Sequence, residues 1–166
     1  MALADDESAV DSLPIALAGA VLLTAIITAL CLYGLHNASP AVQTASVDRQ
    51  AGTLASDCRF LLSMAPRSLE DAGSPPGAEK AVELDLPEGT EYLSFGYDPE
   101  AGDSHAGTIY YKVCGSKKAI VVDERAIFKS ADGSQTVLRS GKYALDIEYA
   151  RDALGRRYLL VSGAQA

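Results

Sequence analysis

Residues 13–35 read LPIALAGAVLLTAIITALCLYGL, and this uncharged stretch determines how the rest of the chain is organised. As a helix, its 23 residues would extend roughly 34 Å at about 1.5 Å per residue, enough to cross a hydrocarbon core about 30 Å thick. Its polar side chains are those of Thr24, Thr28, Cys31 and Tyr33, and a Thr hydroxyl in a helix can bond back to a carbonyl of the preceding turn. The stretch therefore predicts a single transmembrane helix.

Two other interpretations of this stretch fit less well. A buried core helix of such length would be unusual without a polar stripe. A removable secretory signal has a basic start and an apolar run of about 7–15 residues. Here residues 1–12, MALADDESAVDS, form an acidic leader, and the apolar run is longer. We therefore expect the helix to remain in the mature protein, in contact with membrane lipid.

The distribution of charge along the chain excludes several function classes. The 166 residues carry a net charge of −8, and all 14 Lys and Arg lie at or beyond Arg49. An acidic chain without a basic cluster is not typical of a nucleic-acid-binding protein. Two His and three scattered Cys also exclude a Cys/His zinc module and a disulfide-dense miniprotein.

Small side chains form a stripe along the predicted membrane helix. Ala16, Ala20, Thr24 and Thr28 follow one another at steps of four residues, which places them on one helix face. Small residues let helices approach closely in lipid, so the stripe favours packing against a second copy or a related subunit. The alternative is that Ala and Thr are simply common in such helices.

Two weak signals place the C-terminal part outside the cell. Asn37-Ala38-Ser39 is a glycosylation sequon, although Pro40 directly follows it. Cys58 and Cys114 are the two cysteines beyond the apolar run, which suits one disulfide in an oxidising compartment. Two free thiols remain the alternative. We expect a single-pass membrane protein with an extracellular C-terminal domain.

An amphipathic helix is expected after the membrane segment. Apolar residues recur at alternating steps of four and three between Val47 and Ala65, with polar residues between them, and Pro66 ends the pattern. We expect a stalk at 36–65, helical from about Ala41, and a linker rich in Pro, Gly and Ser at 66–79. The seam consists of Val47, Ala51, Leu54, Cys58, Leu61 and Ala65.

Residues 80–166 show the period of two that is typical of strands. Val82, Leu84 and Leu86 alternate with acids, and short turns rich in Gly, Pro and Asp separate the later apolar segments. Short connections predict an antiparallel meander. The expected fold class is therefore α+β: a long N-terminal helix followed by a small antiparallel β-sheet domain. Further strands are expected at 91–97, 108–114, 118–123, 126–129, 135–139, 143–149 and 157–161.

This layout resembles the type IV pilin class, and most closely archaeal pilin-like proteins. Residues 5–12, DDESAVDS, lead directly into the apolar run, as in archaeal members, and residues 86–89, LPEG, are similar to a turn in their external domains. The resemblance implies a structural, non-enzymatic subunit of a cell-surface filament, whose apolar helices pack in the core with the β domain outside. It also implies an acid near the start of the mature helix, either Glu7 or Asp11. Leaders of the class usually end in a basic residue at the peptidase site. This chain departs from that pattern, because no Lys or Arg precedes Arg49.

Two other functions are possible from the residues. The chain could be a membrane-anchored accessory protein whose β domain binds a partner or ligand, because anchor, stalk and domain would look the same. An enzyme is not supported by the residue inventory. His36 abuts the membrane, and His105 lies beside Asp103 and Ser104 in a stretch typical of a loop. We expect no catalytic, cofactor-binding or metal site.

Two groups of charged residues are further candidates for a site. Five acids surround one loop and could hold Ca²⁺, but their spacing matches no EF-hand. They are Glu88, Glu91, Asp98, Glu100 and Asp103. The basic pairs Lys117-Lys118 and Arg156-Arg157 are interpreted as solvated charges in turns.

Overall fold

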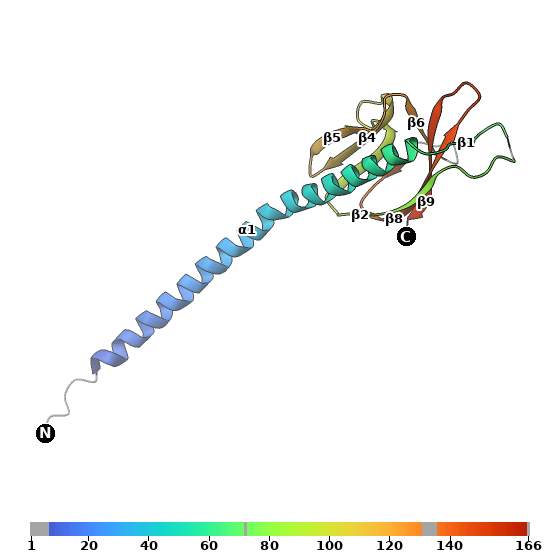
Figure 1. Ribbon diagram of the computed structural model, residues 1–166. Coiled ribbons are helices and arrows are strands. Elements are labelled where there is room, and N and C mark those ends of the chain that lie inside the picture. Colours follow the sequence, from blue (N-terminus) through green and yellow to red (C-terminus); the bar gives the residue numbers. More distant parts are fainter. Residues whose placement is uncertain (1–6, 72, 131–135, 166) are drawn as a thin grey trace. The chain divides into compact units, whose positions relative to one another are not determined.

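The computed structural model describes the backbone of residues 7–71, 73–130 and 136–165, with side chains for all of these except 7–16, 36, 37, 164 and 165. The chain divides into two compact units, Met1–Ser39 and Pro40–Ala166. A single helix, α1 (Glu7–Leu62), contributes to both (Figure 1). The second unit begins at Pro40, which has no N–H and so removes one bond from the helix ladder at that point.

The strands of the second unit form two sheets. The first has the order β1-β8-β9-β6, with β2 also paired to β8, and the second has the order β5-β4-β3-β7. Long strands with alternating burial, such as β2, present one face to the core and one to solvent. The strands are β1 (Arg67–Ser68), β2 (Glu79–Leu86), β3 (Thr90–Tyr97), β4 (Ser104–Val113), β5 (Ser116–Val121), β6 (Ala126–Ser130), β7 (Val137–Leu138), β8 (Gly141–Arg151) and β9 (Arg157–Gln165).

The α+β class and the long N-terminal helix are confirmed, but the prediction of a purely antiparallel domain is wrong. β1 pairs with β8 in parallel, and β6 pairs with β9 in parallel. The reason is the chain path: after β6 the chain enters β7 of the other sheet and then β8 before β9 returns beside β6. Short connections predict antiparallel pairing between consecutive strands, but they do not predict pairing between strands that are distant in sequence, such as β6 and β9.

One face of α1 completes the core between the sheets. The seam residues Val47, Ala51, Leu54, Cys58 and Leu61 are all at most 3 % exposed and belong to one apolar cluster with residues of both sheets. The amphipathic helix is thus confirmed up to its last turn. The prediction fails at its end, because α1 stops at Leu62 and Ala65 is exposed.

Polar side chains attach α1 to an edge strand of each sheet. On the β2 side, Asp57 pairs with Lys80, and Gln50 bonds to the main chain of Asp85. On the β5 side, Lys118 Nζ lies 2.6 Å from Asp48 Oδ2, and Arg59 donates to the carbonyls of Val121 and Val122. At Asp85 and at Val121, side chains of α1 thus satisfy main-chain groups of these edge strands.

Candidate functional site

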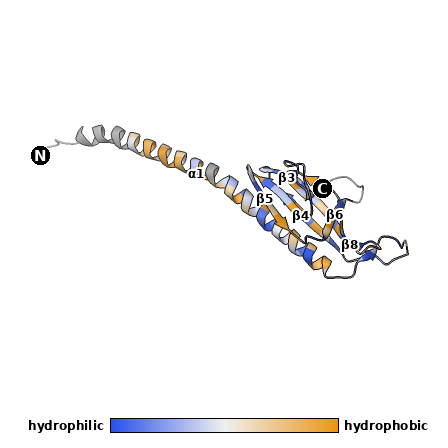
Figure 2. Ribbon diagram, turned by 90° about the horizontal axis from the view of Figure 1, so that it is seen from above, coloured by the Kyte–Doolittle hydropathy of each residue, from blue (hydrophilic) through white to orange (hydrophobic). Residues whose placement is uncertain are grey.

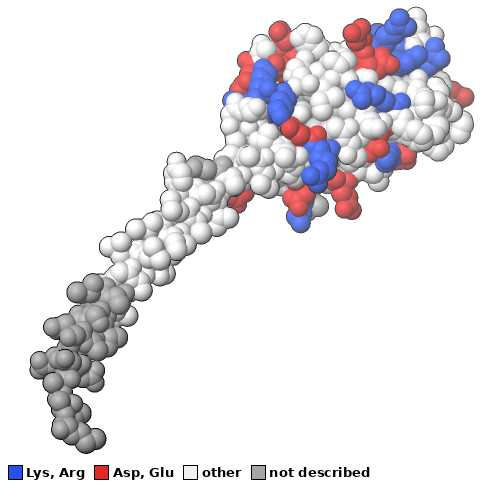
Figure 3. Space-filling model, turned by 60° about the vertical axis from the view of Figure 1, so that its left-hand side comes forward, with Lys and Arg blue, Asp and Glu red and all other residues white. Residues whose placement is uncertain are grey.

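The apolar segment of α1 is exposed along its length. Every side chain described between residues 17 and 35 is exposed, including Leu17 at 69 % and Leu35 at 70 %. Among the described residues this is the one helix long and apolar enough to cross a membrane, with a mean hydropathy of 2.1 in its best window. Figure 2 shows the apolar colouring of this segment, and Figure 3 shows no charged side chain along its described part. In water such a surface would be strongly unfavourable.

Within this segment the predicted stripe of small side chains forms part of a shallow apolar surface, here called the strip. Thr24 Oγ1 donates to the carbonyl of Ala20, and Thr28 Oγ1 donates to the carbonyl of Thr24, both at 2.8 Å. The back-bonding expected for these hydroxyls is thus present, and it removes their need for a partner in lipid. Ala16 continues the stripe in α1, but its side chain lies outside those described. The strip is lined by Ala20, Val21, Thr24, Ala25, Thr28, Ala29 and Leu32.

Three other predicted residues stay untested by the structure. The backbones of Glu7, Asp11 and Asn37 belong to α1, but their side chains lie outside those described. The acid proposed near the start of the mature helix and the glycosylation site therefore stay predictions.

The two cysteines of the second unit are free thiols and form no disulfide. Cys58 is buried on α1, whereas Cys114 is exposed in the β4–β5 turn, with its Sγ 3.5 Å from Gln43 Oε1. Gln43 precedes Cys58 by fifteen helical residues, or roughly 22 Å at about 1.5 Å per residue. That separation is far too large for a disulfide. Burial, followed by the charge of Asp57, raises the pKa of the Cys58 thiol to about 12.

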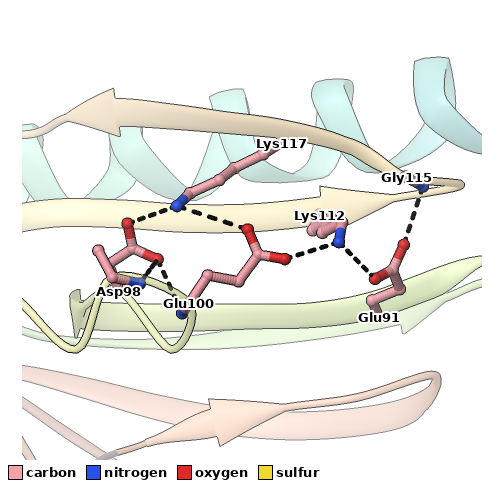
Figure 4. Close-up of polar contacts among 7 residues, drawn as sticks. Glu91, Asp98, Glu100, Lys112, Gly115 and Lys117 are labelled. Atoms are coloured by element: carbon pink, nitrogen blue, oxygen red, sulfur yellow. Dashed lines mark hydrogen bonds and ion pairs between the residues drawn. The ribbon is translucent and has the colours of Figure 1, made fainter.

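Three of the five acids named as Ca²⁺ candidates, Glu91, Asp98 and Glu100, form an ion-pair network with two lysines (Figure 4). Lys112 Nζ lies 2.9 Å from Glu91 Oε2 and 2.6 Å from Glu100 Oε1. Lys117 Nζ lies 2.6 Å from Asp98 Oδ2 and 3.6 Å from Glu100 Oε2. Figure 4 shows these side chains in front of the strands, with α1 behind. The network ties the β3–β4 connection to the β4–β5 hairpin.

The lysines make these three carboxylates poor ligands for a cation. Hydrogen bonds from Lys112 lower the pKa of Glu91 and Glu100, and a hydrogen bond from Lys117 lowers the pKa of Asp98. Each of these three carboxylates thus already has an ammonium partner, with two lysines shared among them. Among the described residues there is no group of three or more His, Cys, Asp or Glu side chains placed to hold a metal ion. Sequence reasoning missed these pairs because Lys112 and its partners Glu91 and Glu100 lie on different segments of the chain, in β4, in β3 and in the connection between them.

The remaining charged candidates are also engaged within the fold. His105 is exposed, with its ring 6.2 Å from that of Tyr110. The interpretation of the two basic pairs as solvated charges agrees with their exposure, which is 36–58 % for the four side chains, but each of them also has a carboxylate partner. These partners are Asp98 for Lys117, Asp48 for Lys118, Asp152 for Arg156 and Asp123 for Arg157.

Comparison of the chain with protein-family models, with curated proteins and with solved structures finds no match.

Proposed function

We propose that this chain is a structural, pilin-like subunit of a cell-surface filament, of the archaeal type IV pilin class. The observation that carries the proposal is the exposed, uncharged apolar segment of α1 at residues 17–35, on a helix whose later turns complete the core of a folded β domain. Such a segment needs lipid or other apolar helices around it. A filament core supplies the second of these.

The composition of the segment supports helix packing over simple anchoring. Its small-residue face is uncharged, and the hydroxyls of Thr24 and Thr28 are bonded within the helix. A neighbouring helix can therefore approach that face without leaving a polar group unpaired. The β domain would then face the cell exterior, with no chemistry required of it.

Cysteine cross-linking in cells tests this proposal. In a Cys31→Ser background, Thr24→Cys should give cross-linked products between copies in sheared surface material. Leu22→Cys is the matched control, because Leu22 is also exposed but lies two residues away, on a different face of the helix. Equal products from both positions, confined to membranes, would favour the alternative of an anchored accessory protein.

A further inference from the structure

We draw no further inference here: the strongest candidate, the acidic outer face of β2 and β8, where Glu79, Glu83 and Asp146 have no ion-pair partner among the described residues, is a cluster of exposed carboxylates for which nothing in the structure shows a ligand or a covering partner.

Discussion

The side-chain amide of Gln50 meets both main-chain polar groups of Asp85. Gln50 Nε2 donates to the Asp85 carbonyl at 2.8 Å, and Gln50 Oε1 accepts from the Asp85 N–H at 2.8 Å. A residue of α1 thereby takes the place of a neighbouring strand at the free edge of β2. This contact fixes the position of β2 along α1.

Removing that amide should loosen α1 from β2. Gln50→Ala leaves two main-chain groups of Asp85 without their protein partner, so we expect the free energy of unfolding to fall by about 1–3 kcal/mol, or about 0.5–1.5 kcal/mol per hydrogen bond. The measurement is urea unfolding of the full chain in detergent micelles. Ser56→Ala, an exposed position on the same helix, is the control. A loss no larger than that of the control would contradict this role.

A comparison of Gly107→Ala with Gly102→Ala separates the energetic cost of steric crowding from the cost of an unfavourable backbone conformation. Both have positive φ, +67° and +71°, but a Cβ at Gly107 would lie 1.8 Å from the Asp123 carbonyl oxygen, whereas nothing lies within 4 Å at Gly102. Gly102→Ala should cost about 1–2 kcal/mol for the left-handed conformation. Gly107→Ala should cost clearly more, because main chain must also move. Equal losses of unfolding free energy in the same urea experiment would contradict the packing of β4 against the β5–β6 connection.

The cysteines of the second unit should differ sharply in reactivity. Cys114 is exposed, whereas Cys58 is buried and its thiol pKa is raised to about 12. At pH 8, iodoacetamide should therefore modify Cys114 in the folded chain and Cys58 only after unfolding, because the thiolate is the nucleophile. Intact mass spectrometry of a Cys31→Ser chain counts the adducts, and Cys114→Ser serves as the control. Rapid modification of Cys58 in the folded Cys114→Ser chain would show that α1 is not packed as described.

The ion-pair network should stabilise the fold at neutral pH and lose its effect in acid. The pKa values of Glu91, Asp98 and Glu100 are lowered in the folded state, chiefly by hydrogen bonds from Lys112 and Lys117. A lowered pKa contributes stability above the ordinary carboxyl values, near pH 4, which is lost as the pH falls through the folded-state values. The destabilisation caused by Lys112→Met should therefore be constant from pH 7 to about pH 5 and shrink below about pH 4.

Lys142→Met is the control for that pH series. Lys142 and Asp85 form an ion pair at 3.5 Å in which both side chains are about 70 % exposed, 73 % and 69 %, so the pair is well screened by solvent. Its removal should change the free energy of unfolding little at any of these pH values. A Lys112→Met effect that does not depend on pH would mean that the aliphatic part of Lys112, not its charge, stabilises the sheet.

The parts of the fold that were predictable are those set by local periodicity. The seam from Val47 to Leu61 gave the buried face of α1, and the alternation from Val82 to Leu86 gave the edge strand that packs beside it. In both, burial follows directly from a repeat of 3.5 or 2 residues. The predicted helix end failed because Ala65 continues the repeat in sequence although the chain has already left the helix at Leu62.

The parts that were missed depend on residues far apart in sequence. Nothing local distinguishes Lys112 as the partner of Glu91 and Glu100, or Asp48 as the partner of Lys118. The parallel pairing of β6 with β9 likewise requires knowing that the chain returns from the other sheet.

The most direct test of the filament account is the intact mass of the native chain, measured separately in sheared surface material and in washed membranes. The account predicts that the chain is present in the sheared material, with a mass short of the full length by a few N-terminal residues. A full-length mass found in washed membranes alone would contradict it, and would leave a membrane-anchored domain that acts through a partner.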